Sequence, residues 1–284
     1  MQKVEFIEAA YQAFIEFDLR QSFYLADQRF VINTYAGSNE RSRGYDLEAL
    51  ALVPLFLQLK VSDFYPAFSR SKLQAARSKG GVVDNPGFYA FSLHPDRKSA
   101  TYKQHNLLAA LHAGGSYARY IAPLFHLSSD LERLKYSFRD PYWGCSPAGL
   151  RDRHMYYWRD YLSFDHSISI LPHRPVLDPR TVPHKYTYSL KRHVCFHSEV
   201  ERTQDGERFM ESVYDELTRV ADEEPLSLAA INTRIREALA QVEVGAGLPV
   251  QGAAGQTETV HFRILARYLM RSFNIACVLV SARA

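Results

Sequence analysis

The stretch Leu55-Phe56-Leu57-Gln58-Leu59-Lys60-Val61-Ser62 predicts a buried strand that carries two polar side chains. Its apolar residues form a nearly continuous run, Pro54 marks the start of that run, and Ser62-Asp63 marks its end. Residues two apart in a strand point to the same face, so we expect Gln58 and Lys60 to project side by side. Burying both without partners is costly, which indicates a functional reason for their presence.

A third polar residue, Asp46, stands twelve residues before Gln58 and is expected on the preceding strand. A hairpin would bring its carboxylate beside the amide oxygen of Gln58 and the ammonium of Lys60. Asp46 and Gln58 would then bind a hard divalent ion, Mg²⁺ or Mn²⁺, because such ions take oxygen ligands. Lys60 would hold a water or help to deprotonate it for attack on phosphorus.

Asp46 followed by Gln58-x-Lys60 resembles the Asp…(Asp/Glu/Gln)-x-Lys signature of the PD-(D/E)XK, or restriction-endonuclease-like, nuclease superfamily. The commoner form has Glu where Gln58 stands, and the Gln form resembles that of the Mrr-type restriction enzymes. The resemblance covers roughly residues 1–126. It implies that Asp46, Gln58 and Lys60 are catalytic, and a neutral Gln58 is expected to bind metal more weakly than Glu.

Residues 4–19 have helical periodicity, with Ile7, Tyr11, Phe14 and Asp18 on one face, and predict an amphipathic helix. In the superfamily an opening helix often lends a Glu to the metal site. Glu8 and Glu16 are the two candidates for that role, although either would also suit a solvated helix surface. Glu40 is a further possible ligand before Asp46.

The elements after the opening helix are expected in the order of the superfamily core. Strands are predicted over 29–35, 45–53 and 55–62, then another over 88–93, a helix over 102–112 that ends at Gly114-Gly115, and a strand over 117–125. A helix that links two strands of one sheet makes a right-handed crossover with the strands parallel. Lys103 and Gln104 begin this helix beside the catalytic strand, and Gln104 resembles a Gln that RecB-like members place there; a capping or surface role is the alternative.

Positive charge gathers near the proposed site, although the net charge of the chain is only +3. Residues 63–84 are basic and rich in Ser and Gly, with Arg70, Lys72, Arg77 and Lys79, and suit a loop or short helix on the rim of a substrate groove. Lys72, Lys103 and Gln104 are the predicted nucleic-acid contacts. Solvated surface charge is the alternative interpretation of the same pattern.

Residues 127–200 are expected to form a central insertion that is aromatic and basic, and β-rich or irregular. Aromatic and Arg side chains interleaved over 136–165 suit base stacking and phosphate contact, or equally a small satellite core. His193, Cys195 and His197 alternate and would share one face of a strand, with His184 near in sequence. A zinc site there is an alternative chemistry, although a fourth ligand is missing from the pattern.

Residues 201–284 are expected to be largely helical, with helices over 207–222, 227–242 and 257–273 and Ser227 or a neighbour as a cap. The last segment, 275–280, is so apolar that it requires burial on both faces and is expected to join the N-terminal sheet. The sequence thus predicts an α/β protein with a mixed central sheet flanked by helices. Its parts are a restriction-endonuclease-like core (1–126), the insertion (127–200) and a helical C-terminal part (201–284).

Composition and motifs narrow the cellular compartment and the ligand classes that the sequence predicts. The chain has no apolar run of about 20 residues and no signal-peptide pattern, which predicts a cytoplasmic protein without membrane contact. Three scattered cysteines, Cys145, Cys195 and Cys277, agree with a reducing compartment. The glycine-rich stretch 245–255 lacks the Lys-Ser/Thr end of a nucleotide-triphosphate loop.

The leading hypothesis is a metal-dependent endonuclease that hydrolyses phosphodiester bonds in DNA, as the nuclease component of a host-defence system. The alternative is a catalytically inactive nuclease-fold subunit that binds nucleic acid or assembles with a helicase or ATPase partner. The lack of a motor motif in the chain is compatible with both, and so is a homo-oligomer. Cleavage that depends on Mg²⁺ or Mn²⁺ would separate the two hypotheses.

Overall fold

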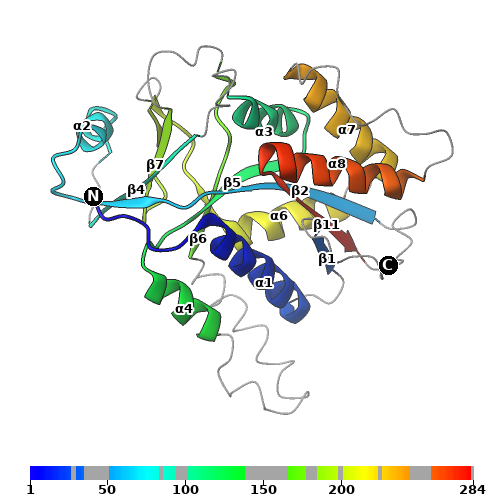
Figure 1. The fold of residues 1–284 in the computed structure, drawn as a ribbon, viewed down its shortest axis with the longest axis horizontal. Helices are drawn as coiled ribbons and strands as arrows, with labels where there is room; N and C mark the ends of the chain where they lie inside the picture. The colour runs from blue at the N-terminus through cyan, green and yellow to red at the C-terminus, as the bar shows by residue number, and fades with distance from the viewer. Residues whose placement is uncertain are drawn as a thin grey trace.

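The computed structural model describes residues 1–26, 30–34, 51–82, 86–93, 102–137, 166–176, 184–197, 201–222, 226–242 and 257–282. These residues form two sheets surrounded by helices (Figure 1). The larger sheet is mixed and has helices on both faces, so the protein has the α/β class that the sequence predicts. None of the helices in the described ranges is long and apolar enough to cross a membrane.

The larger sheet has six strands and combines segments from all three predicted regions of the chain. The final strand lies between the first two, where it pairs antiparallel with both. Only one pairing is parallel, and α3 (Lys103–Ala113) lies between its two strands in sequence, as expected for a crossover. In spatial order the strands are β1 (Phe30–Thr34), β11 (Ala276–Ala282), β2 (Ala51–Leu59), β5 (Tyr117–Pro123), β6 (Ser167–Ile170) and β10 (Glu207–Arg208).

The predicted break at Pro54 is wrong, because β2 runs through it from Ala51 to Leu59. Pro54 lies opposite Leu279 of β11, whereas the β2–β5 ladder begins only at Leu55 and Tyr117. A residue without an N–H is tolerated where one side of the strand has no ladder to receive it. Residues 51–53 therefore belong to the strand that carries Gln58, not to a separate one.

The second sheet contains short strands and continues from the end of β2. It follows the order β3 (Asp63–Pro66), β4 (Gly87–Ser92), β7 (Lys185–Ser189), β8 (Val194–Phe196) and β9 (Glu201–Arg202), all antiparallel. Aromatic rings join the two sheets: the Tyr186 ring of β7 lies 5.3 Å from the Tyr120 ring of β5, measured between ring centroids, and also 5.3 Å from the Phe91 ring of its own sheet. The segment 63–84, expected to be a loop or short helix, does contain a short helix, α2 (Lys72–Lys79), but it begins with a strand, β3, that was not predicted.

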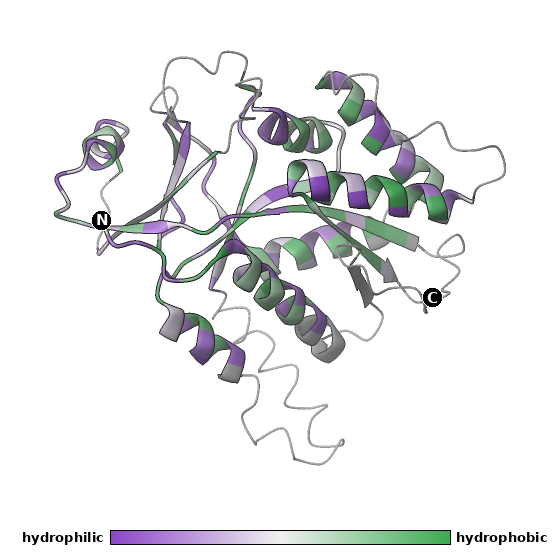
Figure 2. Ribbon diagram, viewed as in Figure 1, coloured by the Kyte–Doolittle hydropathy of each residue, from purple (hydrophilic) through white to green (hydrophobic). Residues whose placement is uncertain are grey.

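Alternation along β2 divides the core into two apolar layers, and Figure 2 shows how hydrophobic β2 and β11 are. Leu52 and Phe56 face α3, α7 (Leu228–Gln241), α8 (Glu258–Phe273) and the second sheet. Leu55 and Leu57 face the remaining large helices, α1 (Glu8–Ala26), α4 (Ser128–Ser137) and α6 (Phe209–Asp222). Because β11 contributes to both layers, its continuous apolar sequence is explained.

Local signals locate several helix ends correctly. Ser227 caps α7, since its hydroxyl accepts a hydrogen bond from the backbone N–H of Ala230 at 3.2 Å. Gly114 ends α3, and Gly115 has the positive φ of 78° that follows many helices. The end of α3 fixes where β5 begins, and β5 is the strand that pairs parallel with β2.

Candidate active site at the junction of the two sheets

Lys60 lies where the chain passes from one sheet to the other. It follows the last residue of β2 and precedes β3, and its N–H still donates to the carbonyl of Ile121 on β5 at 2.9 Å. The side chain is only 2% exposed. The junction therefore holds a buried ammonium on a rigid backbone.

Hydrogen bonds and an ion pair hold the N-terminal segment across this junction and so position the start of α1. Gln2 and Phe64 exchange two backbone hydrogen bonds, and Lys3 pairs with Asp63 at 2.9 Å. The carboxylate of Glu5 accepts from the N–H of Ser128 at 3.0 Å. Helix α1 thus begins at a fixed place beside Lys60.

The helix presents Glu8 to Lys60. One Glu8 carboxylate oxygen (Oε1) lies 3.6 Å from Lys60 Nζ, close enough for an ion pair but beyond hydrogen-bond distance. Glu8 shares a helix face with the buried residues Tyr11 and Ile15, at spacings of three and four residues. Of the two predicted candidates, Glu8 is therefore the one that meets Lys60, while Glu16 accepts from Gln12 at 3.0 Å on the same helix.

The predicted buried face of this helix is correct except at Ile7. Helix α1 begins at Glu8, four residues after the predicted start, and Ile7, which precedes it, is 71% exposed. Because Ile7 precedes the first helical turn, its side chain does not follow the stripe that continues to Leu19. The helical spacing in the sequence does contain the face that α1 turns to the core, and Glu8 is the first residue of that face.

Burial lowers the pKa of Lys60, and the nearby Glu8 carboxylate opposes part of that shift. A lysine with a lowered pKa loses its proton more readily than an exposed one. The pair therefore places a carboxylate beside a buried amine whose pKa lies below its usual value.

Gln58 is also buried, with 1% of its surface exposed, and it lies level with Tyr120 of β5. Three polar atoms of this region, Glu8 Oε1, Gln58 Oε1 and Lys60 Nζ, are buried without a hydrogen-bond partner among the described residues. Such atoms are uncommon in folded proteins and indicate a ligand or a further side chain. Asp46 and Glu40, the other predicted acids, lie outside the described residues.

The Glu8 carboxylate oxygen beside Lys60 is of the ligand type that Mg²⁺ and Mn²⁺ take. Within the described ranges, no group of three or more His, Cys, Asp or Glu side chains is placed to hold a metal. A complete site at Lys60 would therefore need a further acid from outside the described residues, where Asp46 and Glu40 lie.

The alternative zinc site is not formed by His193, Cys195 and His197. Strand β8 spans only Val194–Phe196, so it contains Cys195, while His193 and His197 lie just outside its two ends. His197 Nε2 instead lies 2.7 Å from the hydroxyl of Thr187. The thiols of Cys195 and Cys277 are buried.

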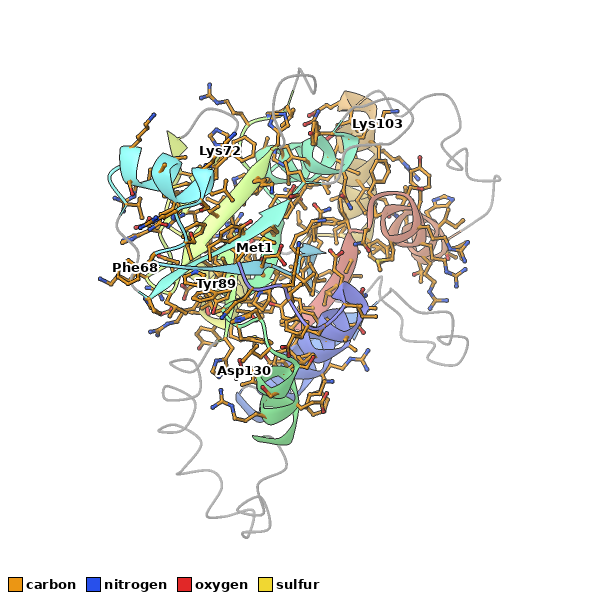
Figure 3. The ribbon with its side chains drawn as sticks, turned by 60° about the vertical axis from the view of Figure 1, so that its left-hand side comes forward. Met1, Phe68, Lys72, Tyr89, Lys103 and Asp130 are labelled. Atoms are coloured by element: carbon orange, nitrogen blue, oxygen red, sulfur yellow. The ribbon has the colours of Figure 1, made fainter. Side chains whose placement is uncertain are left out.

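The predicted nucleic-acid contacts are not brought together. Lys72 and Lys103 begin two helices, α2 and α3, that lie apart in Figures 1 and 3. The Gln104 amide donates to the carbonyl of Phe273 and so ties α3 to the end of α8. Arg77, expected on the basic rim, is buried and hydrogen-bonded to Thr187.

Comparisons of the chain with protein-family models, with curated proteins and with solved structures find no match.

Proposed function

We propose that the protein is a metal-dependent nuclease that hydrolyses phosphodiester bonds in DNA, with its active site at the junction of the two sheets. The observation that carries the proposal is the pair of the buried Lys60 and the partly exposed Glu8, whose charged atoms lie 3.6 Å apart. In this pair, the lysine of the strand motif contacts an acid of the opening helix, as the resemblance to the PD-(D/E)XK superfamily implies. The parallel β2–β5 pair, with α3 between its strands in sequence, agrees with the same resemblance.

Each residue has a distinct role in this proposal. Glu8 and Gln58, together with Asp46, would hold Mg²⁺ or Mn²⁺ through oxygen atoms. When bound, the ion would neutralise negative charge that develops on the phosphate. Lys60 would orient the attacking water and take part in its deprotonation, because its pKa is lowered by burial.

Cleavage assays on plasmid and single-stranded DNA test the proposal. We expect the wild-type protein to cleave with Mg²⁺ or Mn²⁺ and not in EDTA. Lys60→Met should reduce the rate by about a hundredfold or more, the usual contribution of a positioned proton-transfer group. Lys191→Met is the matched control, because Lys191 is exposed in a turn, and it should cleave like the wild type.

Circular dichroism of each variant must show that it is folded before its rate is interpreted. Equal cleavage by wild type and Lys60→Met would remove Lys60 from the mechanism. No cleavage by the wild type with either ion would contradict the proposal and favour the non-catalytic subunit that binds nucleic acid or assembles with a helicase or ATPase.

A further inference from the structure

The turn between β3 and α2 exposes an aromatic side chain at the edge of the molecule. Phe68 is 93% exposed, more than any other large hydrophobic residue that the structure describes. Figure 3 shows it projecting outward at the same end of the molecule as Lys72. Burial of this ring against a ligand would be favourable.

Gln74 holds this turn in one conformation. Its side-chain oxygen accepts hydrogen bonds from the Arg70 N–H and the Ser69 hydroxyl, each at 3.1 Å, while its amide donates to the Ala67 carbonyl. The Ser71 hydroxyl accepts from the N–H of Gln74 at 3.1 Å and caps α2. The exposed ring is therefore presented by a turn whose polar groups are satisfied.

Helix α2 is in turn anchored to the second sheet. The guanidinium of Arg77 donates to the Thr187 hydroxyl at 2.7 Å and to the His193 carbonyl at 3.1 Å. It also lies 5.2 Å from the centre of the Phe88 ring. Because both the turn and the helix are fixed, Phe68 can bind a ligand without the cost of ordering a loop.

The segment that carries Phe68 is positively charged. Residues 64–82 contain no Asp or Glu, and Arg70, Lys72 and Lys79 are exposed. A fixed aromatic ring beside cations has the chemistry that binds single-stranded nucleic acid, in which bases stack on the ring and phosphates meet the cations. A projecting ring can stack on an unpaired base, whereas the bases inside a duplex are already stacked.

We propose that Phe68, Arg70 and Lys72 form a binding site for single-stranded nucleic acid, with Phe68 stacking on an unpaired base. The inference rests on the proposed function in taking nucleic acid as the ligand. Eight residues separate Phe68 from Lys60, so their Cα atoms are at most about 28 Å apart. A strand of roughly eight stacked nucleotides spans that distance, at about 3.4 Å each. The site would therefore hold the substrate at one end while the junction acts on it further along.

Binding of a fluorescent twenty-nucleotide oligo-dT, measured by anisotropy in EDTA, tests this inference without any cleavage. We expect Phe68→Ala to bind about tenfold more weakly and Phe68→Leu to be similarly weak, while Phe68→Trp retains the affinity, since stacking requires an aromatic face. The indole of the Phe68→Trp variant should also be quenched by the oligonucleotide. Arg70→Ala and Lys72→Ala should each lower the slope of log affinity against log salt by about 0.7.

Phe17→Ala is the matched control, because Phe17 is a partly exposed aromatic residue on α1, and it should bind like the wild type. Unchanged binding by Phe68→Ala, full affinity in Phe68→Leu, or no binding by the wild type would each overturn the inference. So would loss of binding to anionic phosphatidylglycerol vesicles by Phe68→Ala with oligonucleotide binding intact. If Phe68→Ala weakens binding but the wild type never cleaves, this site stands and the nuclease proposal fails.

Discussion

Lys60 and Arg77 are two buried cations with opposite surroundings. Arg77 donates to Thr187 and to the carbonyl of His193, and its guanidinium lies near the Phe88 ring. Lys60 has a carboxylate at 3.6 Å and no hydrogen-bond partner among the described residues. A satisfied buried cation stabilises a fold, whereas a cation without hydrogen bonds weakens it. The comparison separates a structural residue from a candidate catalytic one.

The largest effect is expected from removing Arg77. Arg77→Met leaves the Thr187 hydroxyl and the His193 carbonyl without this donor, and we expect the free energy of unfolding to fall by about 4 kcal/mol. Urea denaturation measures the change. Lys79→Met on the same helix is the control, because Lys79 is exposed, and it should change stability by less than about 0.5 kcal/mol. A small loss in Arg77→Met would show that Arg77 is not a structural anchor.

A second large effect concerns pH, through a histidine in the core between the sheets. His105 Nε2 lies 3.1 Å from the Arg174 carbonyl and must donate to it, so Nδ1 accepts from the Tyr120 hydroxyl at 2.8 Å. Burial lowers the pKa of His105 from 6.5 to about 4. Because the unfolded chain then binds more protons than the folded protein, stability should fall as pH drops from about 6.5 to 4, by roughly 3 kcal/mol in total.

Urea midpoints between pH 4 and pH 7 test this dependence, with His105→Gln as the comparison. The variant can keep the donor to Arg174 but has no proton to gain, so its stability should change less with pH. Burial also lowers the pKa of His197 to about 4. Because both proteins contain His197, the stability of each should still fall to some extent as the pH drops. Parallel pH curves for the two proteins would contradict the assignment to His105.

A smaller effect, of opposite sign to that of Arg77, is expected at Lys60. Lys60→Met removes a buried charge while Glu8, whose side chain is 30% exposed, keeps contact with water. We expect the variant to be about 1 kcal/mol more stable than the wild type at pH 7, although it loses cleavage. Since the folded pKa of Lys60 lies below its unfolded value, the wild type should approach the variant in stability as pH rises toward 10.5. Marked destabilisation by Lys60→Met at pH 7 would instead indicate a structural role.

The smallest effects distinguish the two acids of α1. Glu8→Gln should destabilise the protein by less than about 1 kcal/mol, because the ion pair that it loses is partly exposed, while reducing cleavage. Glu16→Gln on the same helix should leave cleavage unchanged, since Glu16 contacts Gln12 and not Lys60. Equal cleavage by both variants would remove Glu8 from the proposed site.

The fold class could be predicted because periodicity is local. The apolar runs of β2 and β11, the cap at Ser227 and the end of α3 at Gly114 depend on near neighbours in sequence. Pro54 misled the prediction because whether a strand tolerates a proline depends on the strands beside it. Here those strands are β5 and β11, which lie far from Pro54 in sequence. Ile7 misled the prediction because the first helical residue is set by how the N-terminal segment is fastened.

The sequence by itself determined most of the helices and strands, the burial of Gln58 and Lys60, and the short list of acids that could meet Lys60. Only the tertiary structure decided that Glu8 rather than Glu16 reaches Lys60, that Arg77 is buried, and that Phe68 is exposed on a fixed turn. The physical reason is the range of the interactions. Propensity and alternation act over a few residues, whereas the partner of a buried charge is chosen by elements that meet only after the chain has folded.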